Sequence, residues 1–323
     1  MHVVTGSTGH IGVNLVRALV ADGRQVRALV HHHPPDIFDD LDIEFANMDL
    51  LDPDSIPPAL EGAEVVYHLA ALISITGPQG GRVYAVNVDG VRNVAEAALA
   101  AGVRRFVHVS SCHAFHINTT LPVVDETADR PGPRAPAYDR SKAAGEAALR
   151  EVIAQGLDAV IINPCGVVGP VDPHPSRMGQ VLLDLRDGRL PSLLDGGFNW
   201  VDVRDVVASA IAAEAQGRTG ENYLLGGHYV ALPELMQLAA TACGSTCPRF
   251  VSPMWLAQIG APFAETWARI FGGDPLYTSE ALHALRINKN LSHEKAAREL
   301  GHSPRPIDQT LRDVYASFTE RGL

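Results

Sequence analysis

The first twelve residues, which read MHVVTGSTGHIG from Met1 to Gly12, decide the fold. A short apolar run meets Gly6, Gly9 and Gly12, and apolar side chains then recur at helical spacing over residues 11–19. Strand, tight turn and helix in this order form the context that a dinucleotide-binding turn requires. Gly6 would allow the bend, Gly9 would let the backbone approach a pyrophosphate, and Gly12 would let the helix pack on the strand. A glycine-rich turn that binds nothing has the same pattern, so this motif needs support from elsewhere.

Composition and charge narrow the class of protein. The 323 residues are 46% hydrophobic and 20% charged, which is ordinary for a globular chain, and the formal net charge is -11. There is no basic run, so we expect no nucleic-acid partner. No apolar stretch approaches the roughly 20 residues that span a bilayer, so we expect no membrane partner. Residue 1 opens directly into the first strand, which predicts a cytoplasmic protein without a signal peptide.

The four cysteines are scattered and form no metal-binding pattern. The last two are separated by one residue too many for a C-x-x-C motif. We therefore expect reduced thiols and no metal site; the cysteines are Cys112, Cys165, Cys243 and Cys247.

Strand and helix patterns alternate through the first half of the chain. Apolar runs predict strands near residues 2–4, 25–30, 43–48, 64–69, 105–109 and 158–163, with helices over 54–60, 84–101 and 137–155 between the later ones. This alternation is typical of an α/β fold with a doubly wound parallel sheet, a Rossmann domain. We assign residues 1–163 to that domain and 164–323 to a smaller, mostly helical substrate-binding region, of which 202–226 returns to the sheet. Helices are expected there over 178–186, 203–214, 232–243, 254–271, 279–285, 292–300 and 307–318.

A second motif, Tyr138-Asp139-Arg140-Ser141-Lys142, supplies candidate chemistry. A Tyr and a Lys four residues apart lie on one face of a helix. The ammonium favours tyrosinate, so we expect a lowered phenol pKa and proton exchange near neutral pH. The strand before this helix ends in Ser110-Ser111, and the carboxyl edge of such a sheet is where ligands bind.

The end of the second strand bears on the choice of cofactor. An acidic residue there favours NAD, whereas a cation favours the 2′-phosphate of NADP. This chain has His31 at that position and no carboxylate until Asp36. The sequence therefore favours NADP, with NAD as the alternative. An exposed polar turn explains the histidines at 31–33 equally well.

Taken together, the motifs resemble those of the extended short-chain dehydrogenase/reductases, the NAD(P)-dependent epimerase/dehydratase family. Thr5–Gly12 matches the T-G-x-x-G-x-x-G turn of the family, and Asp49-Leu50 is similar to its adenine-contacting pair. The stretch from His68 to Ala71 resembles its H-x-A-A segment, and Asn87–Asn93 matches its N-x-x-G-x-x-N helix. The resemblance extends to Asn163–Pro170 and Val201–Val206, and so covers residues 1 to about 226.

The resemblance implies a site and a mechanism. Ser111 would bind the substrate oxygen, Tyr138 would exchange its proton, and Lys142 would hold the nicotinamide ribose and lower the tyrosine pKa; Ser110 would be structural. Two residues depart from the family pattern: Asn163 stands where Arg is usual, and His116 stands where Gly is frequent. Both positions lie near the substrate pocket that the resemblance implies. The implied cofactor-binding residues are Gly6, Thr8, Gly9, His10, Ile11, Gly12, His31, Asp49, Leu50, Leu69, Ala70, Ala71, Asn87, Tyr138, Lys142 and Pro164.

Three functions are open from the sequence. Residues 26–30 and 222–227 resemble the dihydroflavonol-reductase-like branch, which implies an oxidoreductase that reduces a ketone or aldehyde, or oxidises the alcohol. A nucleotide-sugar epimerase is the alternative, since Cys112-His113 replace the Asp-Glu of the dehydrating members. A non-catalytic NAD(P)-binding sensor is the second alternative, which retention of the Ser, Tyr and Lys disfavours. The family also implies a homodimer through the helices at 84–101 and 138–155.

Overall fold

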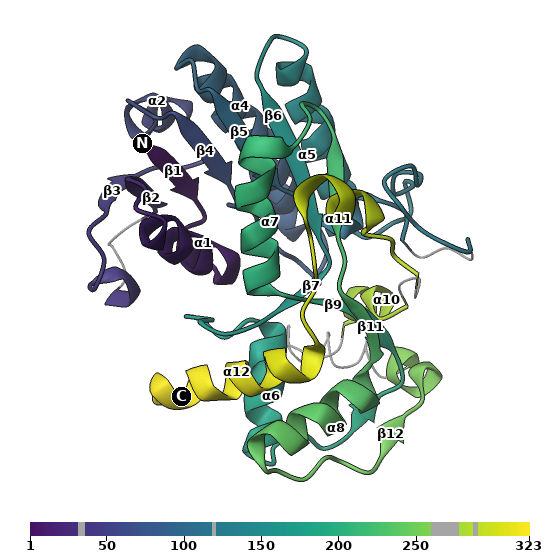
Figure 1. Cartoon of the computed structure of the whole chain (residues 1–323). Helices are drawn as coiled ribbons and strands as arrows, with labels where there is room; N and C mark the ends of the chain where they lie inside the picture. The colour runs from purple at the N-terminus through teal and green to yellow at the C-terminus, as the bar shows by residue number, and fades with distance from the viewer. Residues whose placement is uncertain (32–35, 118–120, 260–277, 287–289) are drawn as a thin grey trace.

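A parallel sheet of seven strands forms the centre of the computed structural model, which describes residues 1–31, 36–117, 121–259, 278–286 and 290–323 (Figure 1). The strand order is β10-β6-β5-β4-β1-β2-β3. The order reverses between β1 and β4, which makes the gap beside them the topological switch point. The doubly wound α/β fold expected from the sequence is confirmed. The strands are β1 (His2–Thr5), β2 (Val26–Val30), β3 (Glu44–Asn47), β4 (Val65–His68), β5 (Arg105–Val109), β6 (Ala159–Pro164) and β10 (Asn222–Leu225).

Apolar runs form these strands because helices cover both faces of the sheet. Neighbouring residues in a strand point to opposite faces, and Val3 and Val4 accordingly belong to two different core clusters. The cluster with Val4 contains residues of α1 (His10–Ala21) and α7 (Val203–Gln216). The cluster with Val3 contains residues of α2 (Ile56–Ala59), α4 (Gly90–Ala100) and α5 (Ala137–Ile153).

The helix expected over 84–101 has a different form. It begins with α3 (Arg82–Tyr84), continues as one π-helical turn, η4 (Ala85–Asp89), and only then becomes α4. Such π turns are rare and often lie at functional sites. Here α5 packs very close, since a Cβ on Gly145 would lie 2.2 Å from the carbonyl oxygen of Asn87. The sequence pattern does not distinguish this turn, because the apolar spacing across it stays helical.

Apart from α7 and β10, most described residues beyond 164 build a second lobe, which is less purely helical than the sequence predicts. A three-stranded sheet joins β7 (Gly166–Val168), β9 (Gly197–Asp202) and β11 (His228–Ala231), and β8 (Leu193–Leu194) pairs with β12 (Val251–Ser252). β7, β8 and β12 have only two or three residues each and give no periodic signal. From the sequence we expect only an extended segment near 190–201, which contains β8 and most of β9. Most of the helix predicted over 254–271 lies outside the described residues. The helices of this lobe are α6 (Arg177–Arg186), α8 (Leu232–Cys243), α10 (Ser279–Ala284) and α12 (Ile307–Glu320).

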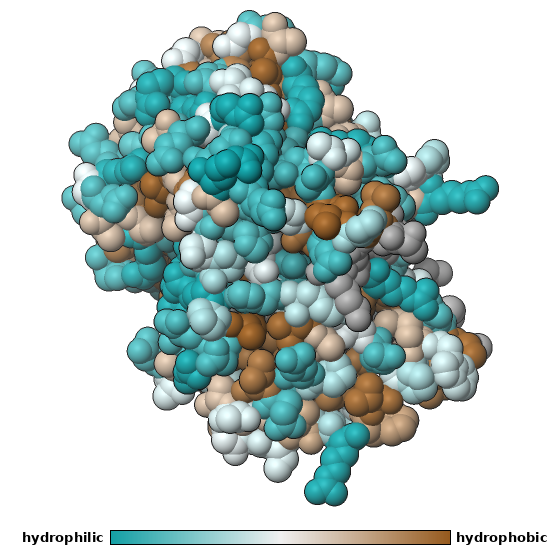
Figure 2. All heavy atoms as spheres, turned by 45° about the vertical axis from the view of Figure 1, so that its right-hand side comes forward, coloured by the Kyte–Doolittle hydropathy of each residue, from teal (hydrophilic) through white to brown (hydrophobic). Residues whose placement is uncertain are grey.

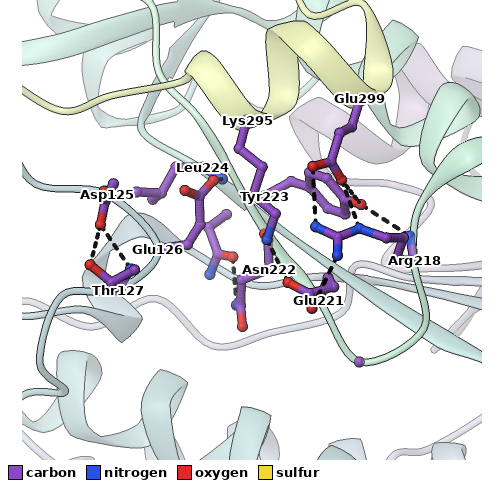
Figure 3. A network of polar contacts seen from close by, with 12 residues as sticks. Asp125, Glu126, Thr127, Arg218, Glu221, Asn222, Tyr223, Leu224, Lys295 and Glu299 are labelled. Carbon is purple, nitrogen blue, oxygen red and sulfur yellow. Dashed lines mark hydrogen bonds and ion pairs between the residues drawn. The ribbon is translucent and has the colours of Figure 1, made fainter.

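A polar network fixes the last part of the chain to the edge strand of the main sheet (Figure 3). From α11 (Glu294–Leu300), Lys295 Nζ donates to Glu221 Oε2 at 2.6 Å and to the carbonyl oxygen of Asn222 at 2.7 Å. Glu299 accepts from Arg218 Nε and from the Tyr223 hydroxyl, both at 2.9 Å. These contacts hold α11 against β10. Short 3₁₀ turns complete the described structure: η1 (Asp36–Phe38), η2 (Pro53–Ser55), η3 (Gln79–Gly81) and η5 (Cys112–Ala114).

Candidate active site

In the glycine turn after β1, Gly6 and Gly12 have the bend and the close packing that the sequence predicts. Gly6 has φ +64°, and a Cβ there would lie 2.7 Å from the backbone nitrogen of Ala70. A Cβ on Gly12 would lie 2.1 Å from the carbonyl oxygen of Gly6, so only glycine lets α1 approach the turn this closely. Gly9 precedes α1 in extended backbone, with φ -80° and ψ 169°. The free N–H groups of the first turn of α1 can therefore face an anion.

Thr5 joins the turn to the end of β4. Its Oγ1 accepts from the backbone nitrogens of Leu69 and Ala70, both at 3.1 Å, and lies 2.9 Å from His68 Nδ1. The small residues Ala70 and Ala71 follow at the switch point, as the sequence predicted. The backbones of β1 and β4 therefore end together, beside the glycine turn.

Six of the predicted cofactor-binding residues line one cavity of about 260 Å³ beside this turn: Gly6, Thr8, His31, Asp49, Leu50 and Ala70. Arg82, at the start of α3, also lines it. Sequence reasoning missed Arg82, because nothing along the chain shows that α3 faces the end of β2. Its cationic side chain is suited to a phosphate. The chemistry of this cavity, a close glycine backbone with an arginine opposite, fits a dinucleotide.

The other predicted cofactor residues have different surroundings. The amide of Asn87 is buried, accepting from the nitrogen of Leu72 at 2.8 Å and donating to its oxygen and to Ser141 Oγ, both at 3.0 Å. Asn87 therefore holds the loop after β4 in place. His10 Nε2 lies 3.2 Å from the carbonyl oxygen of Pro170, and Ile11 packs on the core beneath α1. Pro164 ends β6 and is buried.

Ser111, Tyr138 and Lys142 come from adjacent elements at the carboxyl edge of the sheet. Ser111 follows β5 and caps η5, where its Oγ accepts from the nitrogen of His113 at 3.2 Å. Tyr138 and Lys142 lie one turn apart on α5. Lys142 is 4% exposed, and its Nζ donates to the carbonyl oxygen of Val109 at 3.4 Å. The structure thus places the three side chains around the end of one strand.

Burial controls the protonation of this group. It lowers the pKa of Lys142 to about 8, although the Glu146 carboxylate acts in the opposite direction. The pKa of Tyr138 is raised, mainly by burial, while a hydrogen bond with Ser111 lowers it. The net lowering of the tyrosine pKa expected from the Tyr–Lys spacing is therefore wrong, because desolvation outweighs the favourable contacts. Tyr138 is a neutral phenol at pH 7, ready to donate a proton.

A buried polar network lies behind the catalytic edge and explains Ser110 and Asn163. The Glu146 carboxylate, on α5, accepts from Ser110 Oγ and from Asn163 Nδ2, both at 2.7 Å. Asn163 also donates to the carbonyl oxygen of Ser111 at 2.9 Å. Arg130 contacts Glu146 at 2.8 Å and neutralises it. Ser110 is structural, as predicted, but Asn163 is fully buried, so its side chain braces the Ser111 backbone instead of facing a pocket.

A second, larger cavity of about 460 Å³ lies in the second lobe. The described residues that line it are apolar except for Arg177, Gln180 and Ser192. Ile75 enters it from the loop after β4, and Ala281 and Leu285 enter it from α10 and the residue after it. Figure 2 shows apolar patches on the face of this lobe. The remaining lining residues are Pro175, Met178, Val181, Leu190, Leu193, Leu194, Leu232 and Met236.

A chain of contacts connects one lining residue of this apolar cavity, Leu285, with the catalytic edge. The backbone nitrogen of Gly197 donates to the carbonyl oxygen of Leu285 at 3.2 Å. The next residue, Phe198, stacks on His113, whose ring meets that of Tyr138. Gly197, Phe198 and His113 therefore link Leu285 of the apolar lining to Tyr138.

The fold and the site together define a Rossmann-type enzyme with a nucleotide cofactor. The chain belongs to the NAD dependent epimerase/dehydratase family, whose model matches residues 2–226. It is an NAD(P)-dependent enzyme of that family, a dehydrogenase/reductase or an epimerase.

Several relatives match nearly the whole chain. Sterol demethylase protein B of Methylococcus capsulatus is 37% identical over 99% of both chains. A putative dihydroflavonol 4-reductase of Synechocystis is 32% identical over 99% of this chain and 94% of the relative. The crystal structure of gox2253 has a TM-score of 0.85 and 33% identity, covering 100% of this chain and 98% of that one. PA4631, a nucleoside-diphosphate-sugar epimerase from Pseudomonas aeruginosa, has a TM-score of 0.78 and 25% identity over 99% and 98% of the chains.

No helix within the described ranges is long and apolar enough to cross a membrane. The described residues also contain no group of three or more His, Cys, Asp or Glu side chains suited to a metal ion.

Proposed function

We propose that this protein is an NAD(P)-dependent oxidoreductase that interconverts a ketone or aldehyde and its alcohol. The observation that carries the proposal is the gathering of Ser111, Tyr138 and Lys142 at the carboxyl edge of β5, two strands from the glycine turn of β1. When bound, the cofactor supplies or accepts the hydride. Everything else in the reaction is binding, orientation and proton transfer by this chain.

Each of the three side chains has one task in this mechanism. The Ser111 hydroxyl donates a hydrogen bond to the substrate oxygen and orients it. Tyr138, a neutral phenol because burial raises its pKa, donates its proton to that oxygen as the carbonyl is reduced. Lys142, protonated below its pKa of about 8, stabilises the tyrosinate that remains and holds ribose hydroxyls. In the oxidation direction the same groups act in reverse.

The apolar cavity supports a proposal about the substrate class. A space of about 460 Å³ with one charged lining residue, Arg177, suits a bulky apolar body rather than a diphosphate. We therefore propose an apolar alcohol or ketone as substrate. The names of two relatives, a sterol demethylase protein and a 3 beta-hydroxysteroid dehydrogenase, are in line with this class.

We propose NADP as the preferred cofactor. Among the described residues at the end of β2 that line this cavity, none carries a carboxylate that would repel a 2′-phosphate, and His31 and Arg82 line the same cavity. The family resemblance assigns Asp49, which also lines this cavity, to the adenine. The ratio of NADPH to NADH dissociation constants, measured by quenching of protein fluorescence, tests this; tighter binding of NADH contradicts it.

A substrate screen tests the reaction. We expect oxidation of NADPH with at least one of decanal, cyclohexanone or a 3-oxosteroid, monitored at 340 nm, and none with Tyr138→Phe. UDP-glucose and dTDP-glucose serve as the competing class. The epimerase alternative has support in the similarity to PA4631. Turnover of the sugar nucleotides alone would establish that alternative, and cofactor binding without any turnover would establish a sensor.

We also propose a cytoplasmic homodimer that pairs α4 and α5 of two copies. Tyr84, at the end of α3 and just before these helices, is 54% exposed, which leaves an aromatic side chain for such an interface. Light scattering should give about twice the chain mass of 34.5 kDa. A monomer mass would contradict the dimer.

A further inference from the structure

His113 contacts both Ser111 and Tyr138 but has no part in the mechanism above. It belongs to η5, two residues after Ser111, and its side chain is 13% exposed. Its Nδ1 is 3.1 Å from Oδ1 of Asp139, whose side chain is 9% exposed. Asp139 follows Tyr138 on α5, so one ion pair joins the serine loop to the tyrosine helix.

The imidazole ring also contacts two aromatic rings. It meets Tyr138 edge to face, with centroids 5.8 Å apart, and stacks on Phe198 of β9 at 5.9 Å. Both arrangements are favourable for aromatic pairs. His113 is thus clamped between the tyrosine and the second lobe, and it limits where the phenol ring can lie.

Charges around His113 favour its protonated form. Burial lowers the pKa of His113, but the neighbouring Cys112 and Asp139 raise it by more. The net effect raises the pKa of His113 to about 9. Asp139 in turn raises the pKa of Tyr138, because a carboxylate opposes a second negative charge nearby. The other titratable or charged groups around this cluster are Cys112, His116, His283 and Arg286. The imidazolium of His113 therefore offsets the carboxylate that makes Tyr138 harder to ionise.

We propose that His113 is a positioning residue: it neutralises Asp139 and braces the ring of Tyr138 against Phe198, so that the phenol faces Ser111. The inference rests on the proposed function, since it assigns Tyr138 the proton transfer. It explains why a buried carboxylate is tolerated next to a residue that must lose a proton. A simple packing role for His113 would require neither the charge nor Asp139.

The charge pairing is tested without substrate by NMR on protein with ¹³C-labelled histidine. The His113 signal is assigned by its absence in His113→Gln. We expect it to titrate near pH 9 in the natural chain and about two pH units lower in Asp139→Asn. A midpoint at or below 6.5 in the natural chain, the ordinary value for histidine, would overturn the pairing.

The effect on catalysis is tested by pH profiles of kcat/KM with the best carbonyl of the screen. His113→Gln should raise the pKa of Tyr138 by about one unit, because the positive charge that offsets Asp139 is lost. We therefore expect kcat/KM to fall about tenfold at pH 7 and its alkaline limb to move to higher pH. The double variant His113→Gln/Asp139→Asn removes the uncompensated carboxylate and should return to within about threefold of the natural chain. Equal loss at every pH, or a double variant no better than the single one, would overturn the proposal.

A matched control is His228→Gln, an exposed histidine on β11, which should leave the profile unchanged. The two proposals fail separately. If the natural chain turns over none of the carbonyls, the proposed function is wrong, and the NMR titration still decides whether His113 and Asp139 are paired.

Discussion

The two edges of the main sheet hold their buried polar groups in contrasting ways. At the amino edge, the carboxylate of Glu214 accepts from the Tyr67 hydroxyl at 2.6 Å and from Arg24 and Arg104 at 2.5 and 3.0 Å. Burial would raise the pKa of Glu214, but these partners and His2 hold it well below its usual value. The buried charge there is compensated on several sides.

At the carboxyl edge, Glu146 and Asp139 have charged partners, but burial dominates the charge state of Lys142 and of two neighbouring histidines. Burial lowers the pKa of Lys142 to about 8 and that of His68 to about 3. His68 stacks on His108 of the neighbouring strand at 5.4 Å, and among the described residues neither His68 Nε2 nor His108 Nδ1 has a hydrogen-bond partner. One edge is therefore built for stability, whereas the other keeps its groups available for proton transfer.

The largest expected effect is the loss of turnover in Tyr138→Phe. Removing the phenol removes the proton donor, so we expect kcat to fall at least about a thousandfold, at the upper part of the range for general acid catalysis. The cofactor dissociation constant should change less than about threefold. Tyr67→Phe, at the amino edge, is the matched control: it removes one hydrogen bond to Glu214 and should cost about 1 kcal/mol of stability with kcat unchanged. Normal turnover by Tyr138→Phe would refute the assigned site.

The next effect is on stability at the opposite edge. Glu214→Gln leaves Arg24 and Arg104 without their shared carboxylate and should reduce the free energy of unfolding by about 3 kcal/mol. Because the folded pKa of Glu214 lies below its unfolded value, its contribution is complete above pH 4.5 and is lost as the pH falls further. Urea unfolding of the variant and of the natural chain at pH 7 and pH 4 measures the loss of stability and its dependence on pH. Equal stability of the variant and the natural chain at pH 7 would remove the contrast between the edges.

Lys142→Met should raise the free energy of unfolding, whereas Glu214→Gln lowers it. The folded pKa of about 8 lies below the ordinary lysine value of 10.5. The protonated lysine therefore destabilises the fold below pH 8, and this penalty fades as the pH rises toward 10.5. We expect the variant to be more stable by about 1–2 kcal/mol at pH 7 and to bind NADPH more weakly. In the natural chain, NADPH affinity should fall as the pH rises through 8. A destabilised Lys142→Met would show that this edge depends on its charge for stability.

The smallest effect concerns Arg82. Arg82→Ala should weaken NADPH about tenfold, consistent with the loss of one charged hydrogen bond to a phosphate, and weaken NADH less if the contact is to the 2′-phosphate. Arg92→Ala is the control, since Arg92 pairs with Glu151 on the helix surface. Equal weakening of both cofactors would place the contact at the pyrophosphate, and unchanged binding of both would contradict a role for Arg82.

Much of the catalytic half could be predicted from local sequence. Most strands of the main sheet are largely apolar runs of four to six residues, the edge strand β3 excepted. The glycine turn and the Tyr–Lys spacing are local patterns with a direct geometric meaning. The π-helical turn at Ala85–Asp89 and the short strands β7 and β11 have no such pattern. They depend on packing against Gly145 and against β9, which lie far away in the chain.

The sequence by itself determined the parallel sheet, the glycine turn and the identity of the candidate catalytic residues, because periodicity and short motifs are properties of neighbouring residues. Only the tertiary structure decided how these residues are charged and where their partners lie. Burial, which no local pattern reports, raises the pKa of Tyr138 and lowers that of Lys142. The fold also brings together segments that are far apart in the chain. Arg82 thereby lines the same cavity as His31, Asn163 contacts Glu146, and His113 contacts Asp139.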